Sequence, residues 1–261
     1  MSESSHPQGT FCWPELSTKD PAGAKKFYSS SFGWTIVDQD MGPQGVYTIF
    51  NLNDQPVAAA HQMDPHQQSQ GIPSHWLSYI AVNSADETLA KVTSLGGKVL
   101  MGPFDVFDLG RMGVAQDPHG AAFAVWQAKT MKGVGVKDQA SSLVWTELMT
   151  TDADKARDFY TKLLGYKSEI MEMGPMKYTV LKVGDTPVGG MLKITPDMGP
   201  VPPNWMPYFG VDDCDGFVKK AVGNAATSCM PPTDIPNVGR FAVLQDPTGA
   251  MFSVIKFLPR S

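Results

Sequence analysis

Hydrophobic and polar positions follow two different periods in turn along the first part of the chain. An alternating stretch, typical of a strand with one buried face, comes first. Apolar residues then recur three or four positions apart, between a helix start at Asp20-Pro21 and a helix stop at Gly33. Two short apolar runs around an Asn-Asp pair predict a hairpin next. The pattern indicates a βαβββ module, with strands over 11–17, 46–52 and 56–62 and a helix over 21–32.

The same order of periods begins again at position 76. Leu89, Val92 and Leu95 share one helical face, and Gly96-Gly97 supplies the helix stop. Strand patterns lie on both sides of this helix. The second module therefore has predicted strands over 76–82, 98–101, 111–116 and 121–127.

An internal repeat is the strongest signal in the sequence. The segment 13–34 returns at 145–166, the segment from 47 returns from 178, and the segment from 110 returns from 239. A repeat of roughly 130 residues is too long for a solenoid and suits a duplicated domain. We expect an α+β fold with four βαβββ modules in two tandem domains, 9–128 and 141–258, joined by a polar linker over 129–140.

Composition removes several classes of protein. Lys and Arg number 21 against 26 Asp and Glu, and no basic stretch tracks a phosphate backbone, so we expect no nucleic-acid partner. The longest apolar runs are far shorter than the ~20 residues of a spanning helix, and the polar start lacks a signal-peptide core, so we expect no membrane partner and a cytoplasmic location. Three cysteines without C-x-x-C spacing argue against a disulfide framework or a zinc knuckle.

Several short motifs resemble those of one family. The helix ends FYSSSFGW and FYTKLLGY, the GGKV after the second helix and the QDP-x-G turn before a final strand are similar to the vicinal oxygen chelate superfamily. That superfamily includes glyoxalase I, extradiol dioxygenases and bleomycin-binding proteins, and the resemblance covers about 9–127 and 141–257. It implies two tandem glyoxalase/bleomycin-resistance-type domains of a two-domain, glyoxalase-like group. The fold does not by itself fix the chemistry.

The resemblance also implies where a divalent metal would be held. The positions that carry ligands in family enzymes have no usual donor in this chain, because indole, alkyl and hydroxymethyl groups do not form the N/O sphere of such an ion. We therefore expect no metal and no other cofactor, with a divalent metal on non-standard ligands as the alternative. The positions are Trp13, Leu77, Ala59 or Ala60 and Ala124 in the first half, and Trp145, Met206, Gly190 or Met191 and Ser253 in the second.

The same strands place aromatic and acidic residues together. Residues two apart in a strand share a face, so an indole and a carboxylate point together in each half, into what the resemblance implies is a concave cavity. Such a pair suits a flat or cationic organic ligand. A role of the tryptophans in the core is the alternative. The candidate ligand-binding residues are Trp13, Glu15, Tyr79 and Arg111 in the first half, and Trp145, Glu147, Tyr208 and Arg240 in the second.

The assignment of the two arginines has a competing interpretation. Arg111 and Arg240 suit ligand contacts and also intramolecular pairs with Glu15 and Glu147. Tyr79 and Tyr208 are expected in the cavity, with Trp76 and Trp205 in the layer beneath. The QDP-x-G segments predict tight turns at Asp117 and Asp246.

All five histidines lie in the first half, so an imidazole-based site could exist only there, with Glu15, His61 and His75 as the plausible set. The leading functional hypothesis is a protein that binds a small aromatic or apolar molecule. The alternatives are a glyoxalase- or dioxygenase-type enzyme and a structural or interaction role. Pairing of the two domains within one chain is compatible with a monomer.

Overall fold

The computed structural model of the chain describes residues 6–173 and 176–259. It contains four modules of the order strand, helix and three strands, as the sequence predicts. A short helix, α2 (Pro65–Ser69), precedes the second module, and two 3-10 turns lie at Gly42–Gln44 and Pro196–Met198. Among the described residues, no helix has the length and apolar character needed to cross a membrane.

The first half holds modules one and two. Module one consists of β1 (Phe11–Thr18), α1 (Pro21–Phe32), β2 (Thr35–Asp40), β3 (Val46–Leu52) and β4 (Gln55–Gln62). Module two consists of β5 (His75–Ala81), α3 (Ala85–Ser94), β6 (Lys98–Val106), β7 (Gly110–Gln116) and β8 (Ala122–Ala128).

The second half repeats this order. Module three consists of β9 (Leu143–Thr150), α4 (Ala153–Leu164), β10 (Lys167–Met173), β11 (Met176–Val183) and β12 (Thr186–Lys193). Module four consists of β13 (Asn204–Gly210), α5 (Cys214–Gly223), β14 (Thr227–Ile235), β15 (Gly239–Gln245) and β16 (Met251–Phe257).

Each half forms one eight-stranded sheet. The strand orders are β2-β3-β4-β1-β5-β8-β7-β6 and β10-β11-β12-β9-β13-β16-β15-β14. Within a module, the first strand pairs in parallel with the last, and the other pairs are antiparallel. This arrangement confirms the α+β class and the two tandem domains of the glyoxalase type.

The ends of the long helices follow the sequence signals. The Asp20 side chain accepts a hydrogen bond from Gly23 N at 2.9 Å, and α1 ends at Gly33 in the left-handed conformation. Helix α4 repeats this, with an Asp152 cap and a left-handed Gly165. The cap satisfies backbone N–H groups that the first turn leaves unbonded, and glycine adopts the positive φ at little steric cost.

The contacts divide the chain into two compact units that differ from the sequence repeat. Unit 1 comprises the residues up to 13, 77–133 and 145–206, which are mainly modules two and three. Unit 2 comprises 14–76, 134–144 and the residues from 207 on, which are mainly modules one and four. Each unit therefore takes one module from each half of the chain.

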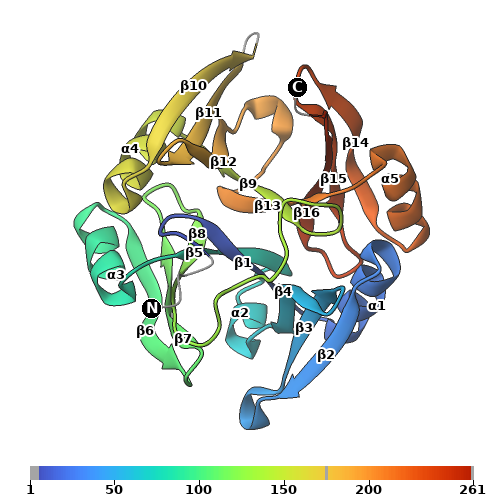
Figure 1. Ribbon diagram of the computed structural model, residues 1–261, viewed down its shortest axis with the longest axis horizontal. Coiled ribbons are helices and arrows are strands. Elements are labelled where there is room, and N and C mark those ends of the chain that lie inside the picture. Colours follow the sequence, from blue (N-terminus) through green and yellow to red (C-terminus); the bar gives the residue numbers. More distant parts are fainter. Residues whose placement is uncertain (1–5, 174–175, 260–261) are drawn as a thin grey trace. The chain divides into compact units, whose positions relative to one another are not determined.

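Helices from different halves share a core in each unit. In unit 2, α1 lies beside α5 (Figure 1). The rings of Phe27 and Phe252 are 6.0 Å apart, and those of Phe32 and Phe209 are 5.3 Å apart. In unit 1, α3 contacts α4 in the same way. Burial of one such side chain contributes roughly 1.5–3 kcal/mol, so much of each core depends on both halves.

Part of the predicted linker packs on unit 2. Gly135 N, within the linker, donates to Pro56 O at 2.7 Å, and Trp34 Nε1 donates to the O atom of Ser141, the residue after the linker, at 2.8 Å. The segment at 129–140 is therefore bonded to the fold along part of its length.

Candidate functional site

The first half-sheet has two different faces. Leu16, Ala58 and Ala60 belong to the buried core that contains α1. Side chains at alternate positions point away from that core, because successive residues of a strand face opposite sides. We call this side the first distal face. It is formed by Glu15 and Ser17 of β1, Tyr47 and Ile49 of β3, and Ala59 and His61 of β4, which are brought together by the strand register.

A carboxylate, a phenol and an imidazole meet on the first distal face. Tyr47 Oη donates to Glu15 Oε2 at 2.5 Å, and His61 Nδ1 lies 3.5 Å from Glu15 Oε1. The Glu15 side chain is only 10% exposed, whereas that of His61 is 34% exposed. The phenol compensates part of the cost of burying the carboxylate. The imidazole is the member of the group that solvent reaches.

The third residue of the histidine hypothesis lies close to this group. His75 Nδ1 lies 2.9 Å from Pro73 O. Burial lowers the pKa of His75, and the nearby His61 lowers it further, although the Pro73 carbonyl acts in the opposite direction. Glu15 and His61 are thus in direct contact, with His75 near them. Within 6–173 and 176–259, no set of three or more His, Cys, Asp or Glu side chains is arranged to hold a metal ion.

The equivalent face of the third module has a different hydrogen bond. This second distal face is formed by Glu147 and Met149 of β9, Tyr178 and Val180 of β11, and Gly190 and Leu192 of β12. Trp145 Nε1 donates to the Tyr178 hydroxyl at 2.7 Å. Tyr178 occupies the repeat position of Tyr47. The Tyr47 hydroxyl donates to a carboxylate, and the Tyr178 hydroxyl accepts from an indole.

The absence of a side chain at Gly190 leaves room for the Tyr178 ring. A Cβ atom at Gly190 would lie 2.2 Å from Tyr178 Oη and 2.4 Å from its Cζ, which no real contact allows. The Tyr178 side chain therefore lies over Gly190. Ala59 has the equivalent register position in the first half and carries that Cβ.

The tyrosines and tryptophans of β5 and β13 are buried. Tyr79 pairs in register with Ala124, and Tyr208 pairs with Ser253. The ring of Tyr79 lies 6.4 Å from that of Trp126. Trp76 and Trp205 lie in the core layer, as predicted, since each indole bonds to a buried tyrosine of a helix.

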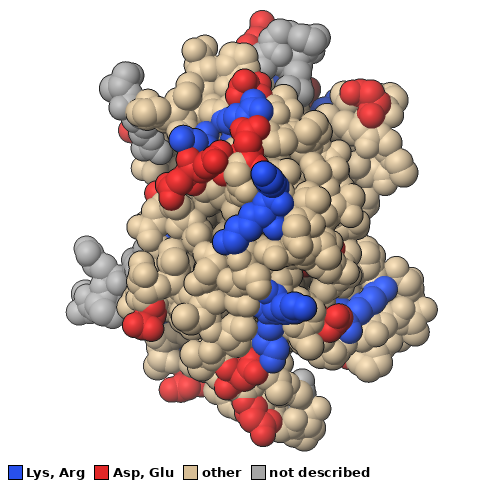
Figure 2. All heavy atoms as spheres, turned by 90° about the vertical axis from the view of Figure 1, so that its right-hand side faces the viewer, with Lys and Arg blue, Asp and Glu red and all other residues tan. Residues whose placement is uncertain are grey.

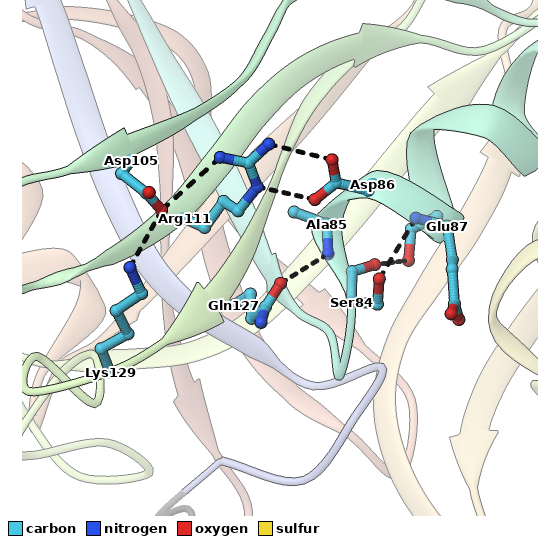
Figure 3. Close-up of polar contacts among 9 residues, drawn as sticks. Ser84, Ala85, Asp86, Glu87, Asp105, Arg111, Gln127 and Lys129 are labelled. Carbon is cyan, nitrogen blue, oxygen red and sulfur yellow. Dashed lines mark hydrogen bonds and ion pairs between the residues drawn. The ribbon is translucent and has the colours of Figure 1, made fainter.

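The two arginines do not pair with the glutamates. Arg111 Nε and Nη2 donate to Asp86 at 2.6 and 2.9 Å, and its Nη1 lies 3.6 Å from Asp105 (Figure 3). Arg240 binds Asp215 through two nitrogens and Asp234 through the third. The predicted alternative of Glu15–Arg111 and Glu147–Arg240 pairs is therefore wrong.

The reason for this correction is local. Each arginine lies just after the turn that follows the edge strand of its module. There it is within hydrogen-bonding distance of an aspartate of the neighbouring helix. These bidentate pairs raise the pKa of both arginines and lower the pKa of Asp86 and Asp215. Each arginine thus links its own strand, β7 or β15, to a helix and to the adjacent edge strand, which is a structural role.

A buried network that sequence reasoning missed occurs in both units. In unit 2, Trp76 Nε1 donates to the Tyr28 hydroxyl at 3.0 Å, and that hydroxyl donates to Asp246 Oδ2 at 2.8 Å. The other oxygen of Asp246 accepts from Thr248 N and Ala250 N within the turn. Burial and the carboxylate raise the pKa of Tyr28 well above its ordinary value.

Unit 1 contains the same network, with the tryptophan and tyrosine from the second half of the chain and the aspartate from the first half. Trp205 Nε1 donates to the Tyr160 hydroxyl at 2.8 Å, which donates to Asp117 Oδ2 at 3.1 Å. Asp117 also holds its own turn, as the QDP-x-G pattern predicts. The signal in the sequence was the co-occurrence of Phe-Tyr in the helix with QDP-x-G in both copies.

The surface carries charges of both signs. Figure 2 shows one face, on which Lys and Arg side chains lie close to Asp and Glu side chains and most of the area is uncharged. This mixture agrees with the net charge of −5.

The four repeated modules and the two eight-stranded sheets indicate the class of protein. The chain belongs to the Glyoxalase/Bleomycin resistance protein/Dioxygenase superfamily, which matches residues 10–125 and 142–254. The family resemblance found in the sequence is thereby confirmed.

The chain is also similar to particular proteins of known sequence or structure. The chain is 43% identical over 259 residues to the "Putative glyoxylase CFP32" of Mycobacterium tuberculosis, with 98% of both chains covered. It is 39% identical to the "Anthracycline biosynthesis protein DnrV" of Streptomyces peucetius, with 95% of this chain and 93% of the relative covered. The fold is similar to the Mn(II)-bound glyoxalase of Novosphingobium aromaticivorans, with a TM-score of 0.66, 16% identity, and 97% and 83% of the two chains covered.

Proposed function

We propose that this protein binds a small aromatic or apolar molecule against the distal faces of its half-sheets, without a divalent metal at the family's ligand positions. The observation that carries the proposal is the chemistry of those positions. Glu15 and Glu147 pair in register with Ala59 and Gly190, whose methyl group and hydrogen atom offer no ligand atom.

The remaining positions also offer few atoms that could bind a metal ion. Tyr79 pairs in register with Ala124, and the indole nitrogens of Trp13 and Trp145 are hydrogen-bond donors only. Zn²⁺ and similar ions take imidazole, thiolate or carboxylate ligands. The residues present do not fit an ion held in the family manner, so no step through a metal is derived.

The surroundings suit an organic ligand instead. The Tyr47 ring lies beside the buried, hydrogen-bonded carboxylate of Glu15, and Tyr178 and Trp145 are hydrogen-bonded to each other in the half that holds the buried Glu147. Apolar surface with a few convergent polar groups is typical of small-molecule sites. The relative named for anthracycline biosynthesis supports an aromatic ligand, because anthracyclines are flat polycyclic compounds.

One observation favours a second candidate function. The contact of Glu15 with His61 brings an acid and a base together where solvent reaches the imidazole. Such a pair could act as a proton-transfer group in a glyoxalase-like enzyme that uses no standard metal site. The relative named as a putative glyoxylase is in line with this candidate.

Two measurements test the leading proposal. After exhaustive dialysis, we expect less than about 0.1 equivalent of Mn, Fe, Ni or Zn per chain by elemental analysis. A stoichiometric ion that survives dialysis would overturn the metal-free proposal.

For the ligand, thermal-shift screening with a panel of bicyclic aromatic compounds should give hits with the natural chain. Trp145→Ala should weaken these hits, because it removes both an aromatic plane and the donor to Tyr178. Phe107→Ala is the matched control, since that ring is 69% exposed in a turn between strands. Unchanged shifts in Trp145→Ala and in the equivalent Trp13→Ala would contradict the proposed location.

A further inference from the structure

Register makes the two distal faces comparable position by position. One row across the first face runs through Gln39, Tyr47, His61 and Ser17. The corresponding row across the second face runs through Met171, Tyr178, Leu192 and Met149. Both rows have a tyrosine in the same place. The other three positions differ in kind, because they are polar in the first half and apolar in the second.

The polar row contains a buried group that lacks a partner. Ser17 is 4% exposed, and its Oγ has no hydrogen-bond partner among the described residues. A buried hydroxyl without a partner has lost its water without compensation, which is unfavourable. Ser17 pairs in register with His61 and lies two residues from Glu15, so its side chain is on their face.

Two threonines of unit 1 also lack partners, but their position differs. Thr146 and Thr150 lie two positions before and two positions after Leu148 in the strand. They therefore share the face of that fully buried leucine and not the second distal face. The second distal face therefore has no equivalent of Ser17. At that position it carries Met149, which is 8% exposed.

The two tyrosines reinforce the contrast. Tyr47 directs its hydroxyl to the Glu15 carboxylate and so helps to build a polar group with His61. The Tyr178 hydroxyl accepts a hydrogen bond from Trp145 Nε1, and the Tyr178 ring lies over Gly190. The neighbours of Tyr178 in its row, Leu192 and Met171, are apolar.

We infer that the two distal faces are specialised for different ligand chemistry. The first binds the hydroxyl-bearing part of a small organic molecule, through His61 and Ser17 beside Glu15. The second binds a purely apolar or aromatic part or molecule, through Met149, Leu192 and the Tyr178 ring. This inference rests on the proposed binding function and adds that the two sites of one chain are not equivalent.

The chemistry of each row supports this division. Serine hydroxyl and neutral imidazole both donate and accept hydrogen bonds, so they can serve a ligand hydroxyl in either role. Methionine and leucine offer polarisable apolar contacts without directional demands. A hydroxyl placed against Met149 and Leu192 would lose its water without gaining a partner from either side chain, which is unfavourable.

A pair of probes that differ only in the hydroxyl tests the inference. We would titrate 2-naphthol and its methyl ether, 2-methoxynaphthalene, into the full chain by calorimetry. One hydrogen bond is worth about 1 kcal/mol, which corresponds to roughly a fivefold preference for the naphthol at the first face. Ring-nitrogen NMR of the five histidines gives an independent readout, in which the His61 signal should move with 2-naphthol.

Reciprocal variants separate the two faces. The double variant Ser17→Met with His61→Leu gives the first row the residues of the second, and Met149→Ser with Leu192→His makes the opposite exchange. We expect the first variant to lose the preference for 2-naphthol while its affinity for the ether stays within about twofold. The second should keep the preference. His61→Leu alone serves if the double variant does not fold, which the thermal unfolding curve would reveal.

The outcomes distinguish this inference from the function on which it rests. If neither probe binds and no other aromatic compound of the panel does, both are overturned. If the ether binds and the naphthol shows no preference, binding stands and the specialisation is wrong. Survival of the preference in Ser17→Met/His61→Leu, or its loss in Met149→Ser/Leu192→His, would also refute the specialisation.

Discussion

Replacement of Tyr28 by phenylalanine should destabilise the protein far more than the loss of one hydroxyl group suggests. The hydroxyl bonds two buried partners, Trp76 Nε1 at 3.0 Å and Asp246 Oδ2 at 2.8 Å. A hydrogen bond to a charged group contributes about 1.5–3 kcal/mol, and a buried indole N–H left without a partner costs about 1–3 kcal/mol. We expect the free energy of unfolding to fall by roughly 3 kcal/mol, out of a total of about 5–15 kcal/mol.

Urea denaturation followed by circular dichroism measures this loss. Tyr160→Phe should cost a similar amount, because its hydroxyl bonds Trp205 and Asp117 in the same way. Ser29→Ala is a control on the same helix as Tyr28, since its hydroxyl bonds only carbonyls of the preceding turn, and it should cost less than about 0.5 kcal/mol. A loss below about 1 kcal/mol for both tyrosine variants would refute the reasoning.

The same network predicts sensitivity to alkali. In the unfolded chain the phenols ionise near pH 10, whereas burial and the neighbouring carboxylates hold the pKa of Tyr28 and Tyr160 well above that value in the fold. Their contribution is therefore fully present below about pH 10 and is lost as the pH rises beyond it. Denaturation curves between pH 9 and 11 should show this decline, and it should be shallower in the phenylalanine variants.

Two further predictions concern charges and the second distal face. The pKa values of Asp86 and Asp215 are lowered by their arginines, so the stabilising effect of these pairs is present above about pH 4 and is lost as the pH falls below it. In a variant with asparagine at both positions, the difference between the denaturation curves at pH 3 and at pH 6 should therefore become smaller. An unchanged difference would contradict this assignment. Gly190→Ala should displace the Tyr178 ring and break its bond to Trp145, with altered indole fluorescence but a retained fold, and a crystal structure that still showed the bond would contradict this explanation.

Much of the architecture could be predicted because its signals are local. The start of α1 at Asp20-Pro21 and its end at Gly33 depend on nearest neighbours, and the structure has them where the sequence places them. The module order was also predictable, since periods of two and of three to four residues alternate regularly. The tandem organisation was visible because the second half repeats the first.

Elements without buried faces were harder to place. All six residues of β2 (Thr35–Asp40) are exposed, so no alternation of apolar and polar residues marks that strand. The second half of β6 beyond position 101 and the five-residue helix α2 lack a periodic pattern for the same reason. In the two strands, the position in the sheet is decided by backbone pairing and not by hydrophobicity.

Side-chain partners were the least predictable part of the candidate site. Glu15 and its repeat equivalent Glu147 were identified as a matched pair, but a tyrosine and a histidine contact the first, and neither arginine does. The position of a side chain depends on register and on single atoms, such as the Cβ that Gly190 lacks beneath Tyr178. Sequence repeats conceal such differences because they align residues and not contacts.

Because the compact units are offset from the sequence repeat, the chain cannot be divided between the repeats without separating residues of one core. Tyr28 of the first half reaches Asp246 of the second, and Tyr160 of the second reaches Asp117 of the first. A protease cut between the repeats would therefore yield two fragments that each lack half of every core they help to form. Neither fragment should be monomeric and folded alone, yet the pair, mixed in equal amounts, should reassociate into the native arrangement.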